Sequence, residues 1–454
     1  MKKNSLLKDT VILTLTQFIL ETLGLLLNSF ITRQLGEVSV GMISLVASFF
    51  SVASVFASGN IFVCASRFIS EELAKPNGNP RKVFGYAVYF CMLSSLIVSS
   101  LVFIFAKRFF ETEYLIAVRI MALSLPVSAI CSCMKGYFNA YRKITVPTIA
   151  DIIEFVIRSA LTAFSTAYLI PAHKISVLSS MAFSIFAGSA ISMIFLCICF
   201  PKADKTSFDN SPSISFSTFF KLSLPILFNS YITVTLSGIN DALVPVTLTR
   251  YSRSAETALS YYGIFEAIII PVLFFPSSAV CCLGSLMIPE ISKSRSKGDN
   301  NETSVFCKKI IRQVLAYSIV TAIVLAVFAD KIGILMSGDE FSGKVIRIMC
   351  PVIPFIYLEI ILESIIKGLG RQVFSCFNYF VEYVIRISVL LISVPFCGFN
   401  GLILSYFASN IVGNTIRIFA IRKFLSTPDC LKCSCSYSEC EKCKCTKEKL
   451  SFSR

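Results

Sequence analysis

The sequence is poor in charged residues and in several side chains that enzymes use. Its 454 residues include no tryptophan and a single histidine, His173, and only 15% of them are Asp, Glu, Lys or Arg. A soluble protein of this length carries about 25% charged residues, so the composition excludes a soluble fold. One histidine cannot form a metal site by itself, and no histidine–carboxylate pair typical of a catalytic centre is evident.

Long hydrophobic runs take the place of the missing charge. Hydrophobic residues make up 55% of the chain, and 41 of them are phenylalanine. Runs of about 20 apolar residues, enough to cross a bilayer as a helix, recur along almost the whole length. We therefore predict an all-α integral membrane protein with about twelve transmembrane helices. The expected spans are 10–32, 41–65, 83–106, 114–134, 146–170, 176–200, 217–247, 259–288, 310–329, 345–366, 373–396 and 399–421.

Acidic residues are fewer than basic ones, 27 against 42, which gives a formal net charge of +15. With the N-terminus inside, most of the Lys and Arg residues fall in inner connections, inner helix ends and the two tails. This asymmetry predicts a multi-pass protein of the cell membrane with both termini in the cytoplasm. The basic loops then face anionic lipid headgroups, so we expect membrane lipids as partners and no nucleic acid.

The two halves of the sequence align with each other at a slowly drifting offset. Gly41 falls on Gly263, and "IEFVIR" at 153–158 falls on "VEYVIR" at 381–386. Six helices in each half preserve the orientation of the repeat, which predicts two parallel, pseudo-symmetric lobes around a central cavity. The predicted domains are an N-terminal six-helix lobe (1–200), a cytoplasmic linker (201–216), a C-terminal six-helix lobe (217–425) and a cytoplasmic tail rich in Cys and Lys (426–454).

Both repeated hexapeptides place opposite charges inside an apolar span. Glu154 and Arg158 are four residues apart, with Asp151 about one turn earlier, and Glu382 and Arg386 repeat the pair. A charge at the bilayer centre costs about 2.5–3.5 kcal/mol, so it needs a partner or a wet cavity. We predict that each pair neutralises itself on a helix face at the lobe interface. The alternative is that these groups face the substrate or couple an ion.

Other polar residues within the spans have no local partner. Glu21 and Asn28 lie in the first span, which ends at Arg33, and Asn240 and Asp241 lie in the seventh. The first helix of each lobe would line a central cleft, so we predict that these residues face a cavity.

The C-terminal tail repeats the spacing C-x-x-C-x-C. Its cysteines are Cys430, Cys433, Cys435, Cys440, Cys443 and Cys445. Thiolates at this spacing can hold zinc or another soft metal. The alternative is a disordered, lipid-modified or merely basic tail. Transport itself requires no cofactor under either interpretation.

Three stretches resemble a known family. They are "SRFISEELAKPNG" (66–78), "RIMALSLPVSAICSCMKGYFNAYRK" (119–143) and "ALSYYGIFEAIIIPVLFFPSSAV" (258–280). They are similar to the stage V sporulation protein B group, in the polysaccharide-flippase branch of the multidrug/oligosaccharidyl-lipid/polysaccharide exporter superfamily. The resemblance implies two six-helix bundles in a V that open alternately to either side. It also implies a lipid-linked saccharide of the undecaprenyl-pyrophosphate type, or a peptidoglycan precursor, as cargo.

This resemblance gives roles to particular residues. A pyrophosphate headgroup needs cationic partners, and arginine is the best fork for phosphate. The candidates are Arg33, Arg67, Arg158 and Arg386. Pro271 and Pro276 would interrupt a helix of the second lobe and form a bending gate. The resemblance further implies a protein that functions as a monomer, with enzymes of polysaccharide or peptidoglycan synthesis as partners.

The sequence therefore predicts a flippase without covalent chemistry, and two rivals remain. One is an ion-coupled multidrug antiporter of the same superfamily, in which Glu21, Asp151, Glu154 and Asp241 would exchange protons or sodium for an organic cation. A basic cavity favours pyrophosphate and an acidic one favours a cationic drug. The other rival, a membrane enzyme such as a saccharide ligase, would need a larger outer loop with acid–base groups.

Overall fold

The computed structural model describes residues 3–73, 78–109, 114–170, 176–203, 215–296 and 300–426. Within these ranges the regular structure is helical, without strands. Twelve helical segments are long and apolar enough to cross a membrane, as predicted. His173, most of the predicted linker and the six tail cysteines lie outside the described residues.

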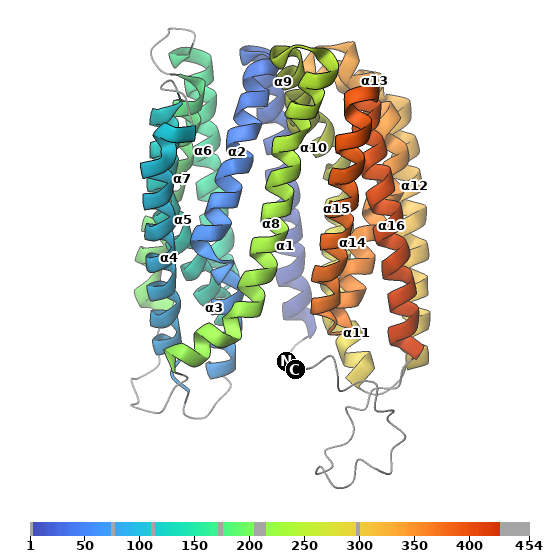
Figure 1. Ribbon diagram of the computed structural model, residues 1–454. Helices are drawn as coiled ribbons and strands as arrows, with labels where there is room; N and C mark the ends of the chain where they lie inside the picture. Colours follow the sequence, from blue (N-terminus) through green and yellow to red (C-terminus); the bar gives the residue numbers. More distant parts are fainter. Residues whose placement is uncertain are drawn as a thin grey trace.

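The first half of the chain supplies six of these segments, coloured blue to green in Figure 1. Its helices are α1 (Lys3–Leu35), α2 (Glu37–Ser58), α3 (Ile61–Leu73), α4 (Pro80–Phe109), α5 (Leu115–Ala140), α6 (Thr145–Phe164), the π-helix η1 (Ser165–Leu169) and α7 (Val177–Ala203). α2 and α3 form one span, which bends at Gly59 and Asn60 because both residues have positive φ angles.

The second half supplies the other six segments. Its helices are α8 (Phe216–Ser252), α9 (Ala255–Ile264), the π-helix η2 (Phe265–Ile269), α10 (Ile270–Phe274), the 3-10 helix η3 (Phe275–Ser277), α11 (Ser278–Ser296), α12 (Asn300–Ser337), α13 (Glu340–Met349), the 3-10 helix η4 (Cys350–Val352), α14 (Ile353–Gly368), α15 (Gln372–Cys397) and α16 (Phe399–Ser426). The predicted spans 146–170 and 217–247 are helices despite their charged residues.

α8 joins the two lobes. Near its beginning, Phe219 and Leu227 belong to the hydrophobic core of the first lobe, and the Phe219 ring lies 5.4 Å from that of Phe68. Near its end, Val244 and Leu248 belong to the core of the second lobe. Figure 1 shows the corresponding course, with α8 running from the lower left of the bundle to the upper centre.

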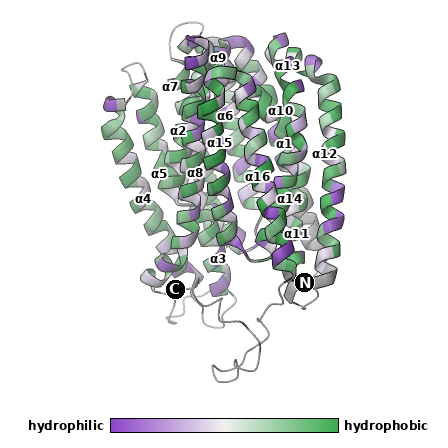
Figure 2. Ribbon diagram, turned by 45° about the vertical axis from the view of Figure 1, so that its right-hand side comes forward, coloured by the Kyte–Doolittle hydropathy of each residue, from purple (hydrophilic) through white to green (hydrophobic). Residues whose placement is uncertain are grey.

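The outer surface of the helices matches a bilayer environment. Figure 2 shows long hydrophobic stretches along the helices and hydrophilic residues gathered mainly near their ends. Large apolar side chains such as Ile104 and Phe396 are 67% and 81% exposed. Such exposure is expected where hydrocarbon chains, rather than water, surround the protein.

A reciprocal glycine contact connects the lobes where α2 and α9 cross. A Cβ atom on Gly41 would lie 2.1 Å from the carbonyl oxygen of Leu259, and one on Gly263 would lie 2.4 Å from that of Glu37. Gly263 and Leu259 are the aligned counterparts of Gly41 and Glu37 at one constant offset. Each glycine therefore packs on the residue four positions before the other glycine. Contacts around a twofold axis are reciprocal in this way. This contact supports the predicted parallel duplication.

The lobes are joined further at the end of the bundle where α1 ends and α9 begins, the upper end in Figure 1. The Arg33 guanidinium donates to the carbonyl oxygens of Ile334 and Leu335 at 2.8 and 2.5 Å. The Ser29 hydroxyl donates to that of Met336 at 2.6 Å. The carbonyls of Leu335 and Met336 lie in the last turn of α12, where helical donors are missing, while that of Ile334 also accepts from the Gly338 N–H at 3.0 Å. α1 therefore caps a helix of the opposite lobe.

The glycine contact gives a testable prediction. Replacing Gly41 with valine puts side-chain atoms against a backbone carbonyl that cannot rotate away. Overpacking of this kind costs about 1–3 kcal/mol, so we expect a lower thermal unfolding midpoint for the purified protein in detergent. Gly85→Val on α4 is the control, because a Cβ atom there meets nothing within 4 Å. Equal midpoints for the two variants would contradict the close approach of α2 and α9.

Candidate substrate site and its charged residues

A polar cavity of about 460 Å³ lies within the first lobe. Its charged lining residues are Glu21 from α1, Lys135 from α5, and Asp151, Glu154 and Arg158 from α6. Glu21, predicted to face a cavity, does so, and its carboxylate also accepts a hydrogen bond from Gln17. Three carboxylates and two cations thus line this cavity, so the sign of its net charge does not by itself favour pyrophosphate, and the position of each cation matters.

The carboxylates of α6 are bound by a lysine rather than by the arginine of their own helix. Lys135 Nζ lies 2.7 Å from Asp151 Oδ1 and 2.9 Å from Glu154 Oε2. Ser189 of α7 donates to the other Glu154 oxygen at 3.0 Å. Arg158 is exposed to the cavity and forms no ion pair within the part of the chain that the structure describes.

The predicted Glu154–Arg158 pair is therefore wrong. A pair four residues apart on a helix contributes only about 0.2–0.5 kcal/mol when it is exposed. Lys135 binds two carboxylates at once, and one of them, Glu154, also accepts a hydrogen bond from Ser189.

The corresponding pair in the second lobe is confirmed. Arg386 Nη2 lies 3.0 Å from Glu382 Oε1, and Arg386 Nε donates to Ser409 at 3.0 Å. The guanidinium carbon also lies 4.6 Å from the centre of the Tyr406 ring. Arg386 is thereby held on three sides.

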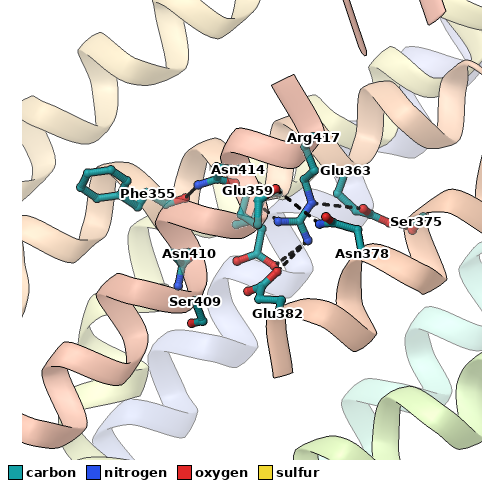
Figure 3. Close-up of polar contacts among 12 residues, drawn as sticks. Phe355, Glu359, Glu363, Ser375, Asn378, Glu382, Ser409, Asn410, Asn414 and Arg417 are labelled. Atoms are coloured by element: carbon teal, nitrogen blue, oxygen red, sulfur yellow. Dashed lines mark hydrogen bonds and ion pairs between the residues drawn. The ribbon is translucent and has the colours of Figure 1, made fainter. Parts of the chain in front are cut away.

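A buried arginine, Arg417 of α16, completes the charge cluster of the second lobe (Figure 3). Its side chain is fully buried, and Nη2 lies 3.0 Å from Glu382 and 3.3 Å from Glu359. Its Nε lies 3.7 Å from Glu363, which is 3.2 Å from Lys367. Three carboxylates in this cluster thus face three cations, Lys367, Arg386 and Arg417, so the cluster is neutral by itself.

One of the aligned positions at which the lobes differ contacts the glutamate of the repeated hexapeptide directly. The alignment that puts Glu154 on Glu382 also puts Ser189 on Arg417. Both residues of the last helix bond the glutamate, at 3.0 Å in each lobe. In the first lobe that position supplies no charge, Lys135 is the cation shared by Asp151 and Glu154, and Arg158 forms no ion pair among the described residues.

A second polar cavity, of about 310 Å³, lies between the lobes. Asp241 of α8 and Glu266 of η2 line it together with Ser48 of α2, whose hydroxyl donates to Asp241 at 2.6 Å. Asn240 donates to the other Asp241 oxygen at 3.4 Å. Neither carboxylate forms an ion pair among the described residues, so the pocket is acidic. The predicted cavity position of Asp241 is observed.

Glu266 occupies a π-helical turn, a feature that often marks functional sites. The carbonyl oxygen of Ala267 in the same turn accepts a hydrogen bond from Asn28 Nδ2 at 3.2 Å. Asn28, predicted to face a cavity, therefore ties α1 to the second lobe at this turn.

An apolar cavity of about 550 Å³ adjoins the acidic pocket. The two share Ser48, Val52 and Gly238 in their walls. Apolar side chains such as Met42 and Phe49 line most of the rest. A polar group and a hydrocarbon chain can thus occupy neighbouring spaces between the lobes.

The other predicted arginines lie away from these cavities. Arg33 binds carbonyl groups of α12, as described above. Arg67 pairs with Glu71 at 2.9 Å, exposed near the end of α3, as a residue at a membrane boundary would. Arg386 is held in its own cluster. Of the four arginines, Arg158 is the one that lines a cavity described here.

The helix of the second lobe is interrupted at the two predicted prolines. Pro271 lies in the short α10 and Pro276 in the 3-10 helix η3. The Tyr317 hydroxyl donates to the carbonyl oxygen of Pro276 at 2.9 Å, and the Tyr357 hydroxyl to that of Leu273 at 3.0 Å. Two tyrosines thus satisfy carbonyls at the break, and the gating role of the prolines stays a prediction.

Lys135, Arg417 and Glu266 were not among the predicted site residues. For Arg417 a signal exists, since Asn410, Asn414 and Arg417 are spaced to share one face of the last span. Lys135 carries no comparable signal, because its carboxylate partners lie on another helix.

Comparisons with known proteins agree with this architecture. The family described as polysaccharide biosynthesis protein matches residues 6–295. The chain is 22% identical to stage V sporulation protein B of Bacillus subtilis (strain 168), covering 94% of this chain and 85% of that protein. It is 18% identical to the lipid II flippase MurJ of the same organism, covering 86% and 77%.

Solved structures show the same fold. An inward-facing multidrug resistance MATE family transporter of the MOP superfamily superposes with a TM-score of 0.69 at 12% identity, covering 89% of this chain and 94% of that one. A MOP superfamily transporter from Pyrococcus furiosus superposes with a TM-score of 0.63 at 15% identity, covering 92% and 97%.

The charge cluster of the second lobe gives a testable prediction. Arg417→Met removes the cation shared by Glu359, Glu363 and Glu382, of which the last two are buried, and breaking a buried pair costs about 3–5 kcal/mol. We expect a clearly lower thermal midpoint, partly recovered by adding Glu382→Gln. Arg422→Met is the control, since Arg422 is an exposed arginine of the same helix. If Arg417→Met and Arg422→Met unfold at the same temperature, Arg417 does not hold the cluster together.

Proposed function

Because the chain belongs to the polysaccharide biosynthesis protein family, we propose that it is a flippase for a lipid-linked saccharide. The cargo is of the undecaprenyl-pyrophosphate type, such as a peptidoglycan precursor, and serves cell-wall, spore-cortex or surface-polysaccharide synthesis. The similarity to stage V sporulation protein B and to a lipid II flippase supports this proposal.

One structural observation carries the proposal most strongly, the unpaired Arg158 in the cavity of the first lobe. Arg158 lies 13 residues after the start of α6, roughly 20 Å along the helix and so near the middle of a bilayer. A cation at that depth needs a partner or a wet cavity, and charges that line such cavities typically mark substrate or ion pathways. A pyrophosphate provides the oxygens that a guanidinium binds in a bidentate manner.

The contacts between the lobes suggest how the headgroup moves. Arg33, Ser29 and the reciprocal glycines join the lobes at the upper end in Figure 1. With both termini in the cytoplasm, as the basic residues predict, this end faces outward and the structure is closed there. Transport then requires these contacts to break while others form at the opposite end. The hydrocarbon chain of the cargo stays in the membrane, and no covalent chemistry is required.

The acidic pocket favours a second candidate function. Asp241 and Glu266, next to an apolar cavity, suit an organic cation with a hydrophobic body. An ion-coupled exporter of such cations would use these carboxylates in exchange for protons or sodium.

The flippase proposal predicts the effect of changing Arg158. In proteoliposomes with a fluorescent lipid-linked pyrophosphate saccharide, we expect Arg158→Ala to slow headgroup translocation by about tenfold or more, since a hydrogen bond to a charged group contributes about 1.5–3 kcal/mol. Arg158→Lys keeps the charge but not the fork, so an intermediate rate is expected. The exposed Arg312→Ala on α12 should transport at the wild-type rate. Unchanged transport by a folded Arg158→Ala protein would remove Arg158 from the path.

The second candidate function is tested with ethidium in the same proteoliposomes. The flippase proposal predicts no ethidium movement driven by a proton or sodium gradient. Gradient-driven movement that Asp241→Asn or Glu266→Gln abolishes, without saccharide translocation by the wild type, would establish the cation exporter instead.

A further inference from the structure

We propose that Lys135 is a positioning residue that keeps the Arg158 guanidinium free for the phosphate groups of the cargo. This inference rests on the proposed flippase function and deepens it. The observation behind it is that the two copies of one charged motif pair differently. Glu382 pairs with the arginine of its own helix, and Glu154 pairs with Lys135 of another helix.

In the second lobe, the motif pairs within its own helix. Glu382 and Arg386 lie 3.0 Å apart, so a glutamate and an arginine at this spacing on this helix can reach each other. Glu154 and Arg158 have the same spacing in the aligned helix of the first lobe. Their separation therefore results from what surrounds Glu154, since the spacing itself permits the pair.

Two neighbouring helices hold Glu154 away from Arg158. Lys135 of α5 binds one carboxylate oxygen at 2.9 Å, and Ser189 of α7 donates to the other at 3.0 Å. α7 approaches α6 closely here: a Cβ atom on Gly188 would lie 2.9 Å from the Glu154 carbonyl oxygen. Each oxygen of the Glu154 carboxylate thus has a donor from another helix.

Lys135 also removes the second carboxylate from competition. Its ammonium lies 2.7 Å from Asp151, and its side chain is only 16% exposed although it carries a charge. A lysine held between two carboxylates is expected to stay charged and fixed. The cavity then presents Arg158 without a carboxylate bound to it.

Loss of Lys135 would restore the pairing seen in the second lobe. Glu154 would be left with Ser189 alone, and Arg158, one turn away, would be the cation at the right spacing on its own helix. The Glu154 side chain is only 24% exposed, so its carboxylate still requires a counter-charge, and Glu154 would turn to Arg158 as Glu382 does to Arg386. The cargo would lose its anion-binding group although Arg158 is still present.

Three variants separate positioning from a structural role. We expect Lys135→Gln to slow saccharide translocation about as much as Arg158→Ala, by about tenfold or more. Adding Glu154→Gln removes the carboxylate that captures Arg158, so Lys135→Gln/Glu154→Gln should recover most of the rate. Lys135→Arg keeps a cation at this position and should stay close to wild type. If the double variant is as slow as Lys135→Gln although it folds, the positioning role is wrong.

A measurement that does not depend on transport distinguishes this failure from that of the proposed function. Phenylglyoxal modifies accessible, unpaired arginines, and the modified Arg158 peptide is quantified by mass spectrometry. Arg158 should react in wild type, become protected in Lys135→Gln, and react again in Lys135→Gln/Glu154→Gln. Equal reactivity in all three proteins would overturn the inference. The expected reactivity pattern without saccharide translocation by wild type would overturn the flippase proposal and leave the control of Arg158 by Lys135 standing.

Discussion

The cost of a charge in hydrocarbon governs this structure more than any other interaction. Each ionisable side chain within the spans needs a counter-charge, a hydrogen-bond network or a wet cavity. The second lobe meets this requirement internally, since Arg417 joins Glu359 and Glu382 and also approaches Glu363. The three carboxylates and three cations of this cluster balance, so each cation in it is already paired. The first lobe meets the requirement differently, through Lys135 and a polar cavity, and among the described residues that line this cavity Arg158 forms no ion pair.

A duplicated architecture thereby acquires two different halves. The reciprocal contact of Gly41 and Gly263 preserves the twofold relation at the lobe interface, where symmetric packing matters. The charged helices have diverged, and the exchange of serine for arginine between positions 189 and 417 is the clearest difference. One lobe has a polar cavity lined by Arg158, and the other a neutral cluster of buried charges. Asp241 and Glu266 lie between them, where a change in lobe contacts would alter their surroundings.

The fold could be predicted from the sequence because the length of a hydrophobic run is a property of one segment, and the repeat is visible when the two halves are aligned. The Glu382–Arg386 pair and the break at Pro271 and Pro276 could be predicted for the same reason, since both depend on residues of one helix. The Glu154–Arg158 pair was wrong because its outcome depends on Lys135, 19 residues earlier and on another helix. The sequence made Arg33 a candidate for binding phosphate. Its contacts with the carbonyl oxygens of α12 could not be predicted, because that helix lies about 300 residues later in the chain. The Cys-rich tail lies outside the described residues, so its metal site stays a prediction.

The central claim is that Arg158 receives the phosphate of the cargo while Lys135 holds the neighbouring carboxylates. An experimental structure of the protein in lipid nanodiscs with an undecaprenyl-pyrophosphate saccharide tests it most directly. The account predicts phosphate oxygens within hydrogen-bonding distance of the Arg158 guanidinium, with Lys135 still bound to Asp151 and Glu154. A headgroup bound outside the cavity of the first lobe, with Arg158 paired to Glu154, would contradict it.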